Sequence, residues 1–83
     1  MQKIIIYPQF RKYQNERIFF KIISKDEWEE IQVVGNNYSL HQFKAAILPD
    51  RNYIHDLTFD YEKNWMLIEE NEYEKVKKKI KHI

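Results

Sequence analysis

The stretch at residues 19–31 recurs in weaker form 45 positions later, at residues 64–76. In this register Glu27 matches Glu72, and apolar residues of similar size align at four further positions. Each stretch opens with bulky apolar residues, typical of a strand, and continues into acids, which are typical of a helix start. The recurrence predicts two similar strand-to-helix units. The alternative is a chance echo, which leaves each segment to be interpreted by itself.

The first unit carries signals for both ends of a helix. Ser24 is followed three positions later by Glu27, which is the spacing of a capping box. Gly35, the only glycine of the chain, stands where a helix of about ten residues needs a left-handed residue after its last turn. We therefore expect a helix over residues 25–34.

The second unit predicts a longer helix. Its apolar residues recur at helical spacing and form one stripe, which consists of Tyr73, Val76, Ile80 and Ile83. Acids open this segment and lysines close it, an order that suits the helix dipole. We expect residues 64–80 to form a strand followed by a helix.

The other segments are mainly typical of strands. Residues 3–7 are rich in β-branched side chains, and residues 9–13 and 17–23 flank a tight turn, so that they predict a hairpin. Residues 38–48 fit either a helix or a strand. The preceding Asn-Asn pair and the two aromatic residues favour a strand. One or two helical turns are expected in residues 49–57, because proline ends the segment before them.

The fold class that follows is α+β, in a single domain of residues 1–83. We expect a small antiparallel sheet of four to five strands packed against two helices that share one face of it. The large apolar residues of the two units should meet in one core cluster. Its expected members are Phe20, Ile22, Trp28, Ile31, Trp65, Leu67, Tyr73, Val76 and Ile80.

The sequence offers little for catalysis, for metals or for cofactors. His41, His55 and His82 show no ligand spacing with one another. One glycine cannot build a phosphate-cradling loop, and Ser and Thr together supply only three hydroxyl groups. We expect no enzyme activity, no metal and no cofactor. Without cysteine there is no disulfide, which favours a cytoplasmic setting, and no apolar run is long enough to span a membrane.

Charge is sorted along the chain although the formal net charge is only +1. Residues 1–21 carry a net charge of +4, residues 22–74 carry −8, and residues 75–83 carry +5. Sorted charge of this kind steers a protein toward a partner and orients it there. The favoured function is therefore a small, non-catalytic protein-binding module.

Composition suggests a concrete form of this function. The residues that the chain prefers, among them Ile, Lys, Asn, Tyr and Phe, have A/T-rich codons, as is common in small proteins of phages and mobile elements. An anti-CRISPR-like inhibitor would place the acidic middle of the chain in the basic nucleic-acid channel of a host defence nuclease. The candidate partner-binding residues are Glu29, Glu30, Asp50, Arg51, Tyr53, His55, Asp56 and Asp60. A structured turn that only serves the fold is the alternative for residues 48–56.

Nucleic acid is the alternative partner. Basic residues interleave with aromatics in the predicted hairpin, and lysines crowd the end of the chain. The candidate contacts are Arg11, Lys12, Tyr13, Arg17, Lys77, Lys78 and Lys81. A charged edge hairpin and a solvated helix face explain the same residues without a nucleic acid.

Overall fold

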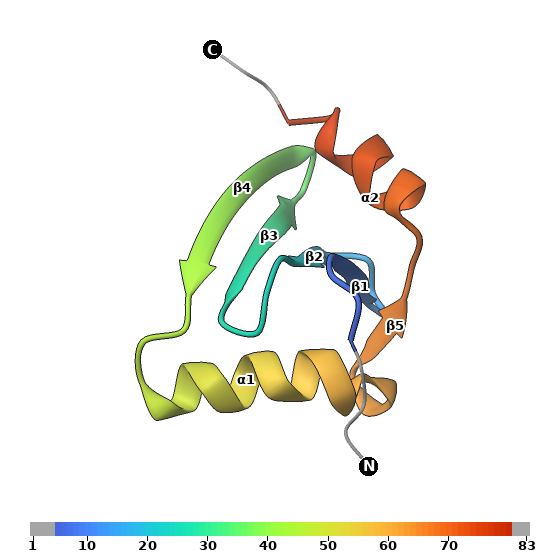
Figure 1. Ribbon diagram of the computed structural model, residues 1–83. Coiled ribbons are helices and arrows are strands. Elements are labelled where there is room, and N and C mark those ends of the chain that lie inside the picture. Colours follow the sequence, from blue (N-terminus) through green and yellow to red (C-terminus); the bar gives the residue numbers. More distant parts are fainter. Residues whose placement is uncertain (1–4, 81–83) are drawn as a thin grey trace.

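The computed structural model describes residues 5–80 as one five-stranded antiparallel sheet between two helices (Figure 1). The strand order is β4-β3-β2-β1-β5, and the expected α+β class is confirmed. The elements are β1 (Gln9–Tyr13), β2 (Ile18–Ile22), β3 (Glu27–Val34), β4 (Asn37–Lys44), α1 (Leu48–Phe59), a 3-10 turn (Tyr61–Lys63), β5 (Trp65–Leu67) and α2 (Glu70–Lys77).

The predicted hairpin is confirmed as β1 and β2. Its turn closes through a hydrogen bond from the backbone N–H of Glu16 to the carbonyl of Tyr13, 2.9 Å long. The side chain of Asn15 accepts a second bond from the backbone of Arg17, in the manner of an Asx turn. This turn sets the register in which Arg11 lies opposite Phe20.

The helix expected over residues 25–34 is wrong, because Glu27–Val34 form β3 and the two residues before it belong to the preceding loop. Trp28 and Glu30 face α1, whereas Glu29 and Ile31 face α2. Both faces of β3 are covered, so the strand lacks the alternation of polar and apolar residues that marks a half-exposed strand. The first of the two predicted strand-to-helix units therefore does not exist.

The supposed helix signals of that segment serve other structures. Ser24 caps no helix; its hydroxyl donates to Oδ1 of Asp26 at 2.9 Å, in the loop between β2 and β3. Gly35 has φ of 60° and lies in the two-residue turn between β3 and β4. A positive φ suits a tight hairpin turn as well as it suits a helix end. Gly35 was therefore an ambiguous signal.

The second unit is confirmed as β5 followed by α2. The helix ends at Lys77, before the predicted end at residue 80, and Ile83 lies outside the described residues. The segment after β3 is a strand up to Lys44, as expected, and the helical turns expected in residues 49–57 belong to the longer α1. The strand expected over residues 3–7 is absent from residues 5–7, and residues 3–4 lie outside the described part.

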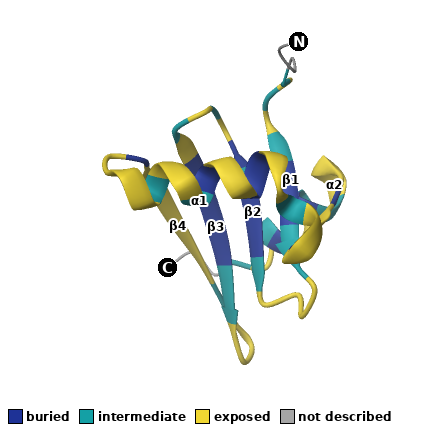
Figure 2. Ribbon diagram, turned by 90° about the horizontal axis from the view of Figure 1, so that it is seen from below, coloured by how far each residue is buried: buried dark blue, intermediate teal, exposed yellow. Residues whose placement is uncertain are grey.

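The two helices cover opposite faces of the sheet, so the expectation of one shared face and of one core cluster is wrong (Figures 1 and 2). On the α1 side the buried residues are Phe20, Ile22, Trp28, Ala45, Ile54, Leu57 and Trp65. On the α2 side they are Phe10, Phe19, Ile31, Ile68, Tyr73 and Val76. Leu67, expected in the core, is 57% exposed on edge strand β5.

Candidate functional site

Two of the predicted partner-binding acids lie inside the protein. Glu29 is 4% exposed, and its Oε1 accepts hydrogen bonds from the hydroxyl of Tyr73 at 2.8 Å and from Nζ of Lys77 at 3.3 Å. Glu30 is 7% exposed and accepts a bond of 2.9 Å from Nε1 of Trp28. A buried carboxylate needs such donors. The hydrogen bonds of Glu29 connect β3 to α2, and that of Glu30 lies within β3, so both side chains serve the fold.

The other six residues of that prediction belong to α1 and its C-terminal end, but they do not form one surface. Tyr53 is half-buried against the rings of Trp28 and Trp65. Asp50 accepts a bond of 3.4 Å from the backbone N–H of Ala46. The exposed ones are Arg51, His55, Asp56 and Asp60. The acidic face expected from the sequence is thus reduced to Asp56 of α1 and Asp60, the residue that follows the helix.

Three of these exposed groups lie close together. One ligand atom from each of His55, Asp56 and Asp60 falls within 4.8 Å of the other two. The three side chains are exposed, and Nδ1 of His55 is 4.0 Å from Oδ1 of Asp56. Exposed acids beside a histidine are common without an ion, so this grouping alone defines no metal centre.

The basic residues predicted to contact nucleic acid are mostly engaged in the fold. Arg11 is 2% exposed, and Tyr13 stacks on Trp65 at a centroid distance of 5.9 Å. Lys12 pairs with Glu16 at 2.6 Å and with Glu72 at 2.8 Å, and these bonds raise the pKa of Lys12.

Few of the predicted nucleic-acid contacts remain available on the surface. Lys77 is bonded to Glu29, whereas Arg17 and Lys78 are exposed. Lys81 lies outside the described residues. The basic and aromatic residues of the hairpin therefore do not form a joint surface for a nucleic acid.

The outer edge of β4 is the surface that sequence reasoning missed. β4 lies at one end of the sheet, and among residues 5–80 no strand pairs with its outer side. This strand is eight residues long, and seven of its residues are exposed (Figure 2). The other edge strand, β5, is only three residues long. We call the outer side of Asn37–Lys44 the β4 edge.

Alternate residues of β4 direct their backbone groups outward. The backbone N–H of Ala45 donates to the carbonyl of Asp26 at 2.7 Å, just beyond the pair Glu27 and Lys44. Antiparallel pairs alternate between hydrogen-bonded and non-hydrogen-bonded positions. The N–H and C=O groups of the alternate residues therefore point to the β4 edge. These residues are Tyr38, Leu40, Gln42 and Lys44.

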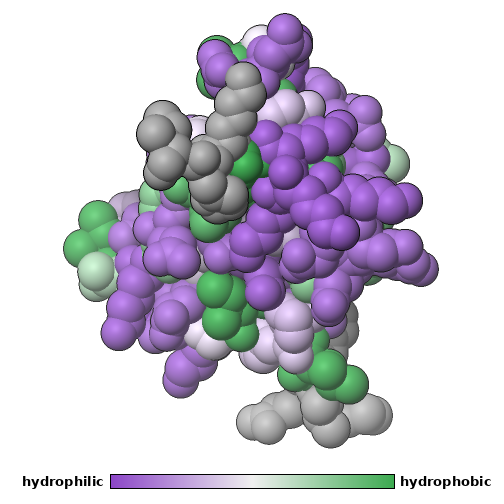
Figure 3. Space-filling model, turned by 90° about the horizontal axis from the view of Figure 1, so that it is seen from above, coloured by the Kyte–Doolittle hydropathy of each residue, from purple (hydrophilic) through white to green (hydrophobic). Residues whose placement is uncertain are grey.

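The β4 edge also has exposed apolar side chains on both faces of the sheet. Leu40, opposite Ile31, is 36% exposed on the α2 side, and Phe43, stacked on Trp28, is 37% exposed on the α1 side. Ile47 and Leu48, which follow the strand in the sequence, are exposed as well. By contrast, the α2 side of the molecule is largely hydrophilic, with small separate apolar areas (Figure 3).

Comparison of the chain with protein families, with curated proteins and with solved structures finds no match. No helix among residues 5–80 is long and apolar enough to cross a membrane.

Two buried tyrosines should set an alkaline limit on stability. Burial raises the pKa of Tyr73, and its hydrogen bond to Glu29 raises it further. Burial is also the main cause of the raised pKa of Tyr53, to which the negative charge of Glu30 adds. In the unfolded chain a tyrosine titrates at about pH 10, so above that pH the unfolded state binds fewer protons than the folded state. The contribution of the two tyrosines to the free energy of unfolding should be constant below about pH 10 and fall above it, by up to about 1.4 kcal/mol per pH unit for each tyrosine.

Urea titrations at several pH values between about 8 and 11 measure this slope. Tyr73→Phe should remove the contribution of one tyrosine from this slope, and Tyr53→Phe should remove that of the other. Equal slopes in the wild type and in both variants would contradict the assignment.

Proposed function

We propose that this chain is a non-catalytic protein-binding module whose β4 edge accepts an extended segment of another protein as a sixth strand. The observation that supports the proposal is the long, uncovered β4 edge. Proteins commonly protect such edges with lysine, proline, bulges or short strands. β5 is short, whereas β4 pairs with β3 in unbroken register and carries its only formal charge at its last residue, Lys44.

Strand addition at this edge would combine affinity with selectivity. The outward N–H and C=O groups bond to the backbone of the incoming segment, which gives sequence-independent binding. Leu40 and Phe43 lie on opposite faces of the sheet and contact alternate side chains of that segment. The fitting segment is thus extended, has apolar residues on both faces and carries few charges.

The inhibitor of a defence nuclease is a special case of this proposal. Its acidic face would rely on Asp56 and Asp60, because Glu29 and Glu30 are buried. In our proposal the β4 edge supplies the main contact, and exposed acids only steer the encounter with a basic partner. No observation favours the nucleic-acid alternative, since Arg11, Lys12 and Tyr13 are engaged in the fold.

Peptide selection tests the proposal and does not require the partner to be identified first. A random peptide library displayed on phage is selected on the wild-type protein, and the enriched peptides are titrated into isotope-labelled protein. We expect enriched peptides with alternating apolar residues, and chemical-shift changes at the amides of Tyr38, Leu40, Gln42 and Lys44. Binding should be weakened about tenfold or more by Leu40→Pro, which removes an outward N–H but no bond to β3.

Leu40→Ala is the matched control, because it keeps the N–H and loses only the side chain; its loss should be smaller. Shift changes confined to α1 or to the turn at Arg17 would contradict the proposal. Self-association of the chain, detected by sedimentation and abolished by Leu40→Pro, would show that a second copy is the occupant instead.

A further inference from the structure

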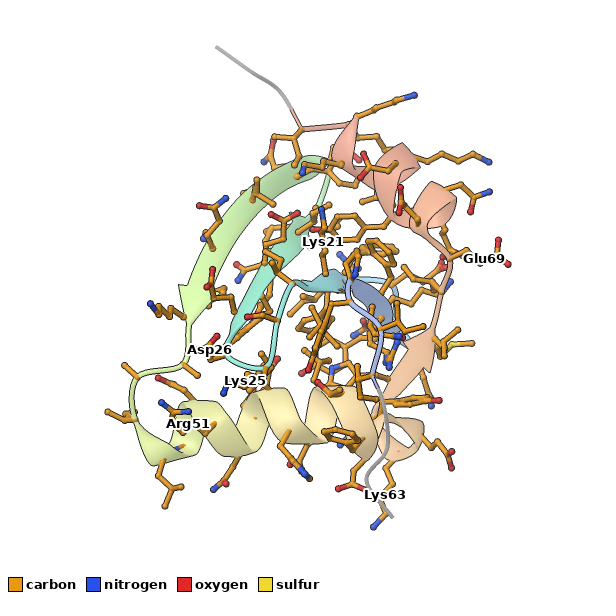
Figure 4. All side chains as sticks on the ribbon, viewed as in Figure 1. Lys21, Lys25, Asp26, Arg51, Lys63 and Glu69 are labelled. Atoms are coloured by element: carbon orange, nitrogen blue, oxygen red, sulfur yellow. The ribbon has the colours of Figure 1, made fainter. Side chains whose placement is uncertain are left out.

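A second feature of the molecule, independent of the β4 edge, is a small cavity between α1 and the loop that joins β2 to β3. The cavity has a volume of about 190 Å³, and three of its lining residues are basic: Lys25 from the loop, and Arg51 and His55 from α1. Figure 4 shows the side chains of Lys25 and Arg51 directed into the same space between the loop and the helix. Within residues 5–80, no acidic residue lines the cavity.

The acids next to Lys25 and Arg51 in the sequence make hydrogen bonds elsewhere. Asp26, next to Lys25, accepts the hydroxyl of Ser24, and Asp50, next to Arg51, accepts the backbone N–H of Ala46. In the described part of the chain, neither Lys25 nor Arg51 has a carboxylate oxygen within 4.0 Å. Among residues 5–80, Lys25 and Arg51 thus face the cavity without a salt bridge, whereas His55 has the carboxylates of Asp56 and Asp60 beside it.

The rest of the lining strengthens an interaction with an anion. Ile54 and Phe59 contribute apolar walls, and Thr58 is buried behind them. Apolar walls on one side of an anion leave it fewer water neighbours, whereas its other side stays open to solvent, so the gain over attraction in water is modest. Tyr7 adds a phenol to the rim.

We propose that this cavity binds a compact oxyanion of the phosphate class. Arg51 offers a planar fork of N–H donors that matches two oxygens of such an anion, and Lys25 adds a point charge. A cavity of about 190 Å³ lies below the roughly 300–1,000 Å³ of pockets for larger ligands. The ligand is thus a free phosphate or the terminal phosphate of a small metabolite.

Amide chemical shifts recorded during titration with inorganic phosphate, at constant ionic strength, test this assignment. We expect saturable changes at Lys25, Arg51 and His55, with a Kd on the order of 1 mM because the site is open to solvent. Glycerol phosphate, titrated in parallel, distinguishes the two sources: equal affinity indicates recognition of the terminal phosphate, and weaker affinity indicates the free anion.

Two matched substitutions separate a site from general attraction. Arg51→Gln should weaken phosphate binding about tenfold, whereas Arg17→Gln, which removes the same charge from the exposed turn after β1, should change it by less than about twofold. Shift changes that stay linear to about ten times the expected Kd would overturn the proposal. An equal loss in both variants would overturn it as well. Both side chains are exposed, so the two variants should fold as the wild type does.

Discussion

Replacing Trp28 with alanine should lower the free energy of unfolding by about 3–5 kcal/mol, as is typical for buried aromatic residues. Trp28 is 5% exposed and lies between the rings of Phe43, at a centroid distance of 5.2 Å, and Tyr53, at 5.6 Å. Its truncation opens a cavity beneath α1. It also removes the indole N–H that satisfies the buried carboxylate of Glu30.

Thermal and urea unfolding measure this loss. For a domain of this size each 1 kcal/mol lowers the Tm by roughly 4–8 °C, so the variant should melt far below the wild type. Phe43→Ala is the matched control, because it removes a neighbouring ring that is partly exposed and should cost about 1 kcal/mol. A Tm unchanged by Trp28→Ala would remove this residue from the core.

Arg11→Ala should cost about 3 kcal/mol, although its position on a short strand in a basic segment suggests a surface residue. Nε of Arg11 donates to the carbonyl of Leu57 at 3.2 Å, and Nη2 donates to that of Thr58 at 3.3 Å. These carbonyls belong to the last turn of α1, which has no donors of its own for them and contains no basic residue. Arg11 therefore caps α1 from β1 and places a positive charge at the negative end of its dipole.

The guanidinium of Arg11 also lies over the ring of Tyr61, 4.2 Å from its centroid. Arg17→Ala, on the exposed turn, serves as the matched control and should change the free energy of unfolding by no more than about 0.5 kcal/mol. Arg11→Lys keeps the charge but loses the fork of donors, so an intermediate loss is expected. Equal stabilities of Arg11→Ala and Arg17→Ala would refute the capping role.

Local patterns were sufficient where turn signals or a periodic apolar stripe mark an element. The hairpin of β1 and β2, the strand at β4 and the pair of β5 with α2 were all predicted from turn signals and periodicity. Residues 27–34 failed because both faces of β3 are buried: Trp28, Glu29, Glu30 and Ile31 form a block with no strand alternation. The acids in that block resembled a helix start, yet their partners are Tyr73, 44 positions away, and the neighbouring Trp28.

The candidate sites depend on strand order, which local patterns do not contain. That β4 lies at an edge follows from β5 joining β1 at the opposite end of the sheet. A signal in the sequence was the low charge of residues 31–49, in which Lys44 is the only charged residue. The phosphate cavity depends on Lys25 and Arg51 meeting across a loop and a helix, and only Arg51 was singled out from the sequence.

The strand order also determines which pairing demands the greatest loss of chain entropy. β1, β2, β3 and β4 pair in sequence order, so short loops close each of their contacts. β5 returns to β1 and brings Leu67 opposite Arg11. The stretch of chain between Arg11 and Leu67 is roughly seven times longer than the one between Lys21 and Glu29. Bringing its ends together therefore costs about 1.7 kcal/mol more in chain entropy. The shortest strand of the sheet thus closes the longest loop, and the packing of Trp65, Ile68 and α2 must offset that entropy.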